Sequence, residues 1–200
     1  MTASETGRDP AMEARIFTSA RTPGGFRPEP LPEGILDRLY ELMKWGPTSA
    51  NSCPLRIVFT VSQEARNRLA DCAPERNAAK IRQAPATAIL GYDLRFFECM
   101  PELFPHNPAM PAMFAADPEL AAATAFRNGS LQGGYFIVAA RMLGLDCGPM
   151  SGFDNAAVDA AFFPDGRVRS NFICALGFAD ASAERPRLPR PTFTQVCAVL

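Results

Sequence analysis

Apolar residues recur along the chain with two different spacings, and these spacings predict where helices and strands lie. Within 33–45 the apolar side chains stand three and four residues apart, as on one face of a helix that Pro32 can start and Gly46 ends. The longest helical pattern runs over 118–143 and is apolar around most of its circumference, with many small residues. It predicts a central, tightly packed helix.

Runs rich in β-branched and aromatic residues predict the strands. They are expected at 56–61, 85–92 and 170–178, with a shorter one at 145–147. A polar helix is expected at 63–71, a short basic segment at 77–82 and a short helix at 156–163. This mixture predicts an α+β fold with three to five strands and helices on both sides of the sheet.

Three segments lack a regular spacing. Residues 1–15 are polar and predict a flexible tail, which leaves 16–200 as a single domain. Residues 93–117 combine Met, Phe and Pro and are typical of a mobile lid or excursion. The arm over 180–200 is rich in Pro and Arg but ends in the apolar run 196–200, so it is expected to lie on another surface, such as a partner subunit.

Composition narrows the class of protein. The chain has 200 residues, of which 48% are hydrophobic and 20% charged, as is typical of one globular domain with a real core. Its 20 basic and 21 acidic residues give a formal net charge of -1, so nothing favours nucleic acid or an anionic membrane as a partner. No stretch reads as a signal peptide or a membrane span, and a cytoplasmic location is the expectation.

Cysteine and histidine usage limits the chemistry. The six cysteines form no Cys-x-x-Cys pair and are expected to be reduced thiols that pack as small apolar residues. Cys53 follows a candidate site loop, where a catalytic thiol is a minor alternative. His106 is the single histidine, so a multi-histidine metal site is excluded and a histidine relay would depend on it alone. We therefore expect no metal, and expect a cofactor to carry the chemistry.

Two loops dense in Pro, Gly and small polar residues stand beside apolar segments, at 46–51 and 148–154. Such loops present backbone N–H groups at fixed angles, which suits a flat polar ligand or an anion. Asn77 and Lys80 are three residues apart and would point the same way on a helical turn.

Basic residues that could hold a phosphate flank these elements. Arg21, followed by Thr22, precedes the first helix, and Arg185 and Arg187 open the C-terminal arm. Cations for a phosphate, together with fixed N–H groups for a ring, make flavin mononucleotide (FMN) the leading hypothesis.

The order of these motifs resembles that of the nitroreductase-like flavoproteins, and the resemblance covers the chain from about Arg21 to Pro189. The matching segments are Ala20-Arg21-Thr22, Pro47 to Leu55, Asn77 with Lys80, Pro149 to Asp154, and Arg185 to Pro189.

The resemblance implies an α+β sandwich with a mostly antiparallel central sheet flanked by helices. It also implies a domain-swapped homodimer with FMN at its interface, and NADH or NADPH as co-substrate. Arg21, Arg185 and Arg187 would hold the phosphate, and Lys80 would stabilise negative charge at flavin N1 and O2. The other implied cofactor contacts are Thr22, Pro47, Thr48, Ser49, Asn51, Asn77, Pro149, Met150, Ser151 and Gly152, of which those within 47–51 would come from the other subunit.

Three positions depart from the family pattern. Gly24 replaces a basic residue whose contact is lost or supplied by Arg27. The usual Gln-Pro-Trp is Cys53-Pro54-Leu55, and Ser151 stands where an acidic residue is often found.

A narrower resemblance concerns the electron acceptor. Segments 44–51, 124–128 and 148–154 look like those of the subgroup with the malonic semialdehyde reductase of uracil breakdown. In that case Arg127 would pair with a substrate carboxylate, although a structural salt bridge is the alternative. Other hypotheses are a general nitro, quinone or enone reductase, a non-catalytic flavin-binding protein for storage or sensing, and a flavin-free interaction domain.

Overall fold

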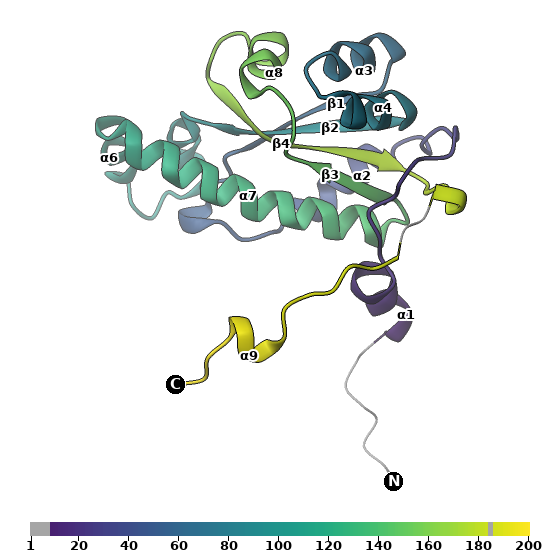
Figure 1. The fold of residues 1–200 in the computed structure, drawn as a ribbon. Helices are drawn as coiled ribbons and strands as arrows, with labels where there is room; N and C mark the ends of the chain where they lie inside the picture. Colours follow the sequence, from purple (N-terminus) through teal and green to yellow (C-terminus); the bar gives the residue numbers. More distant parts are fainter. Residues whose placement is uncertain (1–8, 184–185) are drawn as a thin grey trace.

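Four antiparallel strands form one sheet at the centre of the fold (Figure 1). The computed structural model describes residues 9–183 and 186–200. The spatial order is β1-β2-β4-β3, and each neighbouring pair is antiparallel. The strands are β1 (Leu55–Thr60), β2 (Ala86–Asp93), β3 (Asp146–Met150) and β4 (Val168–Gly177). The expected antiparallel sheet is confirmed.

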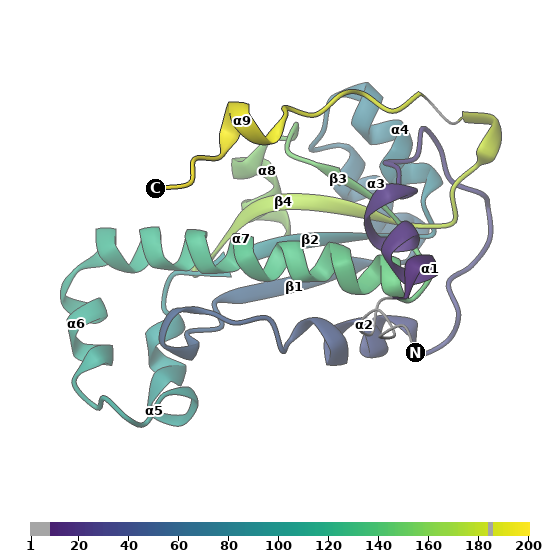
Figure 2. The same cartoon turned by 90° about the horizontal axis from the view of Figure 1, so that it is seen from below.

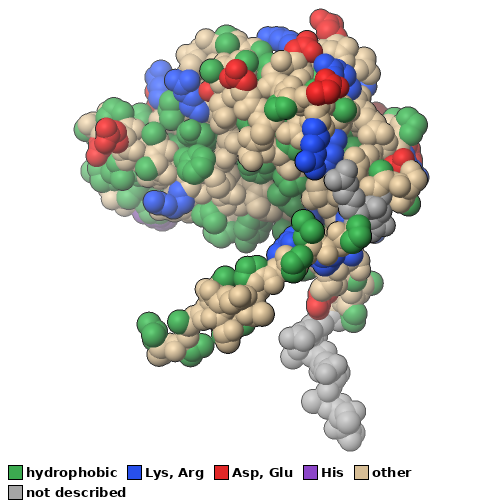
Figure 3. Space-filling model, in the orientation of Figure 1, with side chains coloured by type: hydrophobic (Ala, Val, Ile, Leu, Met, Phe, Trp, Pro, Cys, Tyr) green, Lys and Arg blue, Asp and Glu red, His purple; other side chains and the backbone are tan. Residues whose placement is uncertain are grey.

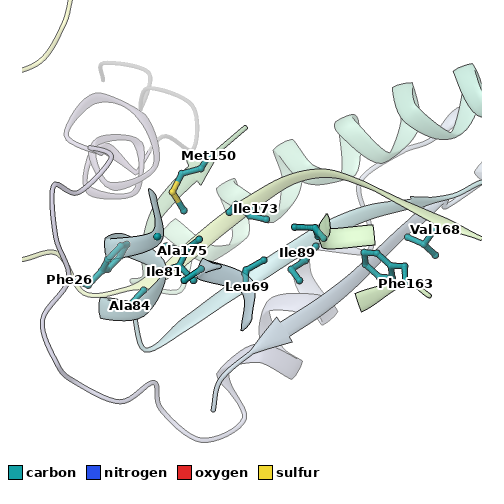
Figure 4. Packing of buried hydrophobic residues seen from close by; sticks show 13 residues of the cluster. Phe26, Leu69, Ile81, Ala84, Ile89, Met150, Phe163, Val168, Ile173 and Ala175 are labelled. Atoms are coloured by element: carbon teal, nitrogen blue, oxygen red, sulfur yellow. The ribbon is translucent and has the colours of Figure 1, made fainter. Parts of the chain in front are cut away.

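Helices cover both faces of this sheet, as expected (Figure 1). One face carries α2 (Ile35–Met43) and α7 (Pro118–Met142); the other carries α3 (Gln63–Ala70), α4 (Glu75–Gln83) and α8 (Asn155–Phe162). Successive side chains of a strand point to opposite faces of the sheet. Ile89 and Ile173 therefore pack toward α3, α4 and α8 (Figure 4), while Leu90 and Cys174 pack toward α2 and α7. Both faces of β2 are therefore buried.

The long helix α7 packs closely on the sheet along one side only. Gly133 allows this, since a Cβ there would stand 2.5 Å from the ring of Phe172. On its other side Leu131 and Tyr135 are 52% and 44% exposed, and Phe126 is exposed as well. The apolar circumference read from the sequence is thus half buried within the chain and half open.

The segment 93–117 is built of short helices, which corrects the expectation of an irregular excursion. A 3₁₀ turn at Phe96–Cys99 leads into α5 (Met100–Leu103), and α6 (Met110–Ala116) follows. Pro occupies the first turn of both α-helices, where its missing N–H costs nothing, so it starts them rather than breaks them. Their apolar side chains form a separate cluster against the start of α7.

The chain ends differ from each other. Residues 10–15, which were expected to belong to a flexible tail, are helical: α1 (Pro10–Glu13), capped by the Asp9 carboxylate, leads into a π-turn (Ala14–Thr18). Arg15 Nε donates to the Arg141 carbonyl, and Arg141 Nη1 donates to the Ile16 carbonyl, both at 2.9 Å. These long-range bonds order a segment that has no regular apolar spacing of its own.

The C-terminal arm leaves the main body instead of packing on it (Figures 1 and 2). After a 3₁₀ turn at Ala181–Ala183, the one helix among residues 186–200 is α9 (Phe193–Val196), which a capping box at Thr192 and Gln195 stabilises. The apolar residues Phe193, Val196 and Leu200 are exposed.

A cluster of charged side chains around the buried Asp93 lies at the C-terminal end of β2. The Asp93 carboxylate is 1% exposed and accepts hydrogen bonds from Arg56 Nη2 at 2.7 Å and from Arg167 Nε and Nη2 at 2.8 Å. The Arg95 N–H adds a fourth at 2.8 Å. Burial raises the pKa of Asp93, but the hydrogen bonds from Arg167 and Arg95 and the charges of Arg56 and Arg167 outweigh it, so this pKa lies below its usual value.

Replacing this carboxylate should destabilise the protein. We expect Asp93→Asn to lower the free energy of unfolding at pH 7 by about 3 kcal/mol, because it leaves paired charges uncompensated. Since the native pKa is depressed, the contribution is complete above the unfolded-state value of about 3.9 and is lost as the pH falls toward the native pKa. Urea unfolding at pH 7 and pH 3 measures both effects. Asp71→Asn, which removes an exposed ion pair with Arg82, is the matched control. Equal losses in the two variants would contradict this role for the cluster.

Candidate functional site

A cavity of ≈ 890 Å³ lies where α4, the segment before α2 and the C-terminal arm meet. Figure 3 shows basic side chains near the point where the arm leaves the body. Six cationic residues line the cavity, namely Arg21, Arg76, Lys80, Arg141, Arg187 and Arg190. The rest of its wall is apolar or neutral, namely Phe17, Ala20, Thr22, Pro23, Gly24, Ala79, Gln83, Pro186 and Leu188.

Local structure explains how these cations converge. Arg76 and Lys80 are one turn apart on the same face of α4. Arg187 Nη2 donates to the carbonyls of Thr18 at 2.6 Å and Ala20 at 3.0 Å, which holds the arm against the N-terminal segment. Lys80 Nζ donates to the Pro23 carbonyl at 3.2 Å. Four separate parts of the chain thus contribute to one positively charged hollow.

The charged side chains in the described wall of the cavity are all cationic, and none is acidic. Desolvation, followed by the positive charges of Arg21, Arg190 and Arg141, lowers the pKa of Arg187. The protein concentrates like charges here, which is the arrangement that an anionic ligand would relieve.

Gly24 lies in the wall of the cavity and could not carry a basic side chain. A Cβ at this position would overlap the backbone carbonyl of Ala183. Arg27 does not line the cavity; it pairs with Glu29 at 2.9 Å and lies over the ring of Phe178. The structure therefore gives no support to Arg27 as the replacement.

The second sequence loop is partly a strand. Pro149 and Met150 belong to β3, where Pro149 is tolerated because β3 is an edge strand, and Met150 is buried in the core. Ser151 and Gly152 follow the strand. Asn77 Nδ2 donates to the Gly152 carbonyl at 2.7 Å, so the structure brings the α4 motif and this segment together.

The first loop is strained and firmly held. Ala50, Asn51 and Cys53 have positive φ values of 49°, 48° and 40°, which non-glycine residues rarely adopt. The Ser49 N–H donates to Asn128 Oδ1 at 2.8 Å, and Asn51 Nδ2 donates to the Leu103 carbonyl at 2.8 Å.

Hydroxyl and thiol contacts complete this loop. Thr48 Oγ1 accepts from the Cys53 N–H at 3.2 Å, and Cys53 Sγ donates to Asn51 Oδ1 at 3.4 Å. The Cys53 thiol thus takes part in holding the turn.

Within one chain, this loop lies beside the middle of α7 and the cavity lies at the C-terminal end of α7. The loop is anchored at Asn128 and the cavity reaches Arg141, and 13 residues of helix between them span about 20 Å. Figure 2 shows the same separation, with α5 and α6 at one end of α7 and α1 at the other. Pro47, Thr48, Ser49 and Asn51 are absent from the described cavity wall.

Two further candidate residues are placed elsewhere. Arg127 lies in a separate groove of ≈ 980 Å³ along the open side of α7, with Phe126, Leu131 and Tyr135. It forms no ion pair with any described carboxylate, so the alternative of a structural salt bridge finds no support. Arg185 lies outside the described residues.

Sequence reasoning missed three of the six cations: Arg76, Arg141 and Arg190. Arg141 had a detectable signal, since it is the single charge in the apolar run 135–145. Arg76 stands one turn before Lys80 and could have been found by helical spacing.

Within residues 9–183 and 186–200, no group of three or more His, Cys, Asp or Glu residues is arranged to hold a metal ion. None of the described helices has both the length and the apolarity that crossing a membrane requires.

Comparison with known proteins places the chain among flavoenzyme-related sequences and folds. The profile of the "Nitroreductase family" matches residues 18–178. A Cupriavidus pinatubonensis protein is 52% identical over 185 residues, covering 92% of this chain and 94% of its own. A Ralstonia pickettii protein, "Putative NADH dehydrogenase/NAD(P)H nitroreductase HadB", is 52% identical over 189 residues, covering 93% and 96%. A nitroreductase structure in complex with FMN, from Exiguobacterium sibiricum, superposes with a TM-score of 0.83 at 19% identity over 98% of this chain and 99% of that one.

Proposed function

Because the chain belongs to the nitroreductase family, we propose that it is an FMN-dependent oxidoreductase that uses NADH or NADPH. The observation that carries the proposal is the cavity at the arm, with its six cationic residues and no described acidic one. Its donors suit a phosphate, and its apolar wall suits a flat ring. The residues present therefore fit FMN.

The residues take separate roles toward the cofactor. Arg21 and Arg187 would hold the phosphate, and Thr22 stands beside them. Lys80, half-buried on α4, would place positive charge near flavin N1 and O2 and favour the reduced state. FMN held by these residues would supply the redox chemistry that links the nicotinamide coenzyme to the second substrate. The protein contributes binding, orientation and electrostatics, so no side-chain acid or base is required.

A second copy of the chain would complete the site. Ser49 lies beside Asn128, about 20 Å along α7 from Arg141 in the cavity wall, and this distance supports a role for the 47–51 loop at the flavin of another subunit. The open apolar side of α7 and the apolar end of the arm support a homodimer, because large exposed apolar patches mark interfaces. In this arrangement Pro149 to Gly152, tied to Asn77, stay beside the chain's own cavity.

For the electron acceptor we propose a small carbonyl compound, malonic semialdehyde, reduced to 3-hydroxypropionate in pyrimidine catabolism. The supporting feature is Arg127, an exposed cation without a described carboxylate partner, next to the Asn128 that anchors the loop. Nitroaromatic compounds, quinones and enones form the alternative acceptor class, and the names of the relatives, which include "nitroreductase", support the nitro compounds.

Neutralising Arg127 should affect the reduction of malonic semialdehyde, which carries a carboxylate, but not the reduction of an uncharged acceptor. We expect Arg127→Gln to raise KM for malonic semialdehyde by about 10-fold, because a charge-assisted hydrogen bond to the carboxylate is lost. The rate with an uncharged quinone should stay the same. Steady-state kinetics with both acceptors measures this, and an equal change for both would exclude a carboxylate contact.

Anaerobic rapid mixing tests the proposed function. Protein loaded with FMN should lose its visible absorbance on addition of NADH or NADPH and regain it when an acceptor is added. Bound flavin that neither coenzyme bleaches would favour the non-catalytic flavin-binding alternative.

A further inference from the structure

The cavity holds more positive charge than one FMN phosphate requires. Arg76, Arg141, Arg187 and Arg190 form no ion pair with any described carboxylate. A phosphomonoester carries only about −1.5 to −2 charges at pH 7. Most of the positive charge would therefore remain unmatched with FMN bound.

The cations lie at two depths. Arg21, Lys80 and Arg141 are half-buried, whereas Arg76, Arg187 and Arg190 are exposed. Among the described residues, Arg190 Nη1 donates only to the nearby carbonyls of Leu188 and Pro189, at 3.2 and 3.1 Å. The Arg76 guanidinium forms no hydrogen bond or ion pair with any described residue. These two side chains are positioned for a ligand group outside the inner pocket.

Without a ligand, the positive charges gathered in the cavity repel one another. Arg76 and Lys80 are like charges at i and i+4 on one helix, a spacing that destabilises helices. The neighbouring arginines also lower the pKa of Arg187, after desolvation. A second anion bound at the mouth would offset this repulsion.

Charge distribution distinguishes the two nicotinamide coenzymes. NADPH differs from NADH by one phosphomonoester on the adenosine ribose. Sites that select NADH commonly place an acidic side chain on that ribose, whereas arginine accommodates the 2′-phosphate. The described wall of this cavity offers arginines and no acid.

We propose that this chain selects NADPH over NADH, and that Arg76 and Arg190 bind the 2′-phosphate of the coenzyme. The inference rests on the proposed function and adds the coenzyme specificity to it. Arg76 comes from α4 and Arg190 from the arm, so the two side chains approach the phosphate from separate elements.

Calorimetry with a pair of adenosine nucleotides tests the proposal directly. FMN-loaded protein is titrated with 2′,5′-ADP and with 5′-AMP, which lacks the 2′-phosphate. We expect 2′,5′-ADP to bind at least about 10-fold more tightly, and Arg76→Ala or Arg190→Ala each to reduce that preference by about 10-fold. The ratio of kcat/KM for NADPH to that for NADH should fall in parallel. Arg38→Ala, an exposed arginine on α2 outside the cavity, is the charge-matched control.

The outcomes separate this inference from the proposed function. Equal affinity for the two nucleotides, or a preference that survives in the Arg76→Ala/Arg190→Ala double variant, overturns the inference while FMN binding stands. Absence of FMN binding in the unaltered protein overturns both. FMN content and unfolding temperature of each variant are measured alongside. Arg76→Lys, which keeps the positive charge, should retain part of the preference for 2′,5′-ADP that Arg76→Ala loses.

Discussion

Reversing the charge of Lys80 or Arg187 is expected to weaken FMN binding by at least about 100-fold, the equivalent of about 2.7 kcal/mol. Each substitution removes a charge-assisted contact and places a carboxylate in the cavity next to the cofactor. Arg187→Glu also removes the donors to the Thr18 and Ala20 carbonyls, so part of its effect comes from a displaced arm. Titration of apoprotein with FMN, followed by flavin fluorescence, measures both dissociation constants.

The control for these variants is Arg38→Glu, which makes the same change of charge on α2, outside the cavity. It should leave FMN affinity within about 2-fold, since exposed charges at a distance are screened by salt. Unchanged retention of FMN in both Lys80→Glu and Arg187→Glu would show that the cofactor, if bound at all, lies elsewhere.

Charged substitutions on the open side of α7 should separate the subunits and abolish FMN binding together. Leu131→Glu and Tyr135→Glu place carboxylates on a face that is half exposed in the single chain. Leu131→Glu loses little packing within the chain, so each copy should still fold; Tyr135→Glu also removes a ring that lies against Gly46, so Leu131→Glu is the cleaner variant. An unpaired carboxylate buried in a dimer interface, in contrast, costs several kcal/mol, and the symmetric interface carries it twice. Because the 47–51 loop would reach the flavin only across that interface, the isolated chain should not retain the cofactor.

Sedimentation and visible absorbance of the same samples measure the two properties at once. Val61→Glu alters an apolar residue that is 52% exposed at the far end of β1, and should leave both unchanged. A folded monomer of Leu131→Glu that keeps FMN would show that one chain holds the cofactor by itself.

The sequence predicts the fold well where local pattern and burial agree. The apolar run of β2 is buried on both faces, and the regular spacing of α2 gives a helix within two residues of its expected bounds. The segment 93–117 was harder, because its prolines occupy helix starts and its apolar residues form a cluster with α7 that only the folded chain reveals.

The sequence predicts only part of the candidate site. Arg21, Lys80 and Arg187 are found by motif order, and the structure brings them to one cavity. Arg141 and Arg76 belong to no motif; each has a local signal in the sequence, but only the fold shows that both line the cavity. The 47–51 loop was expected at the flavin, yet its position within one chain depends on contacts with Asn128 in the middle of α7 and with Leu103 at the end of α5. Such placement depends on long-range contacts, which residue spacing does not report.

FMN binding is tested by a titration of purified apoprotein with FMN, followed by the visible spectrum and by thermal unfolding. We expect a yellow protein with a perturbed flavin spectrum, and stability that rises by about 2.7 kcal/mol when free FMN reaches 100 times its dissociation constant. A spectrum identical to that of free FMN, with an unfolding temperature that does not respond to it, would show that this cationic cavity binds no flavin.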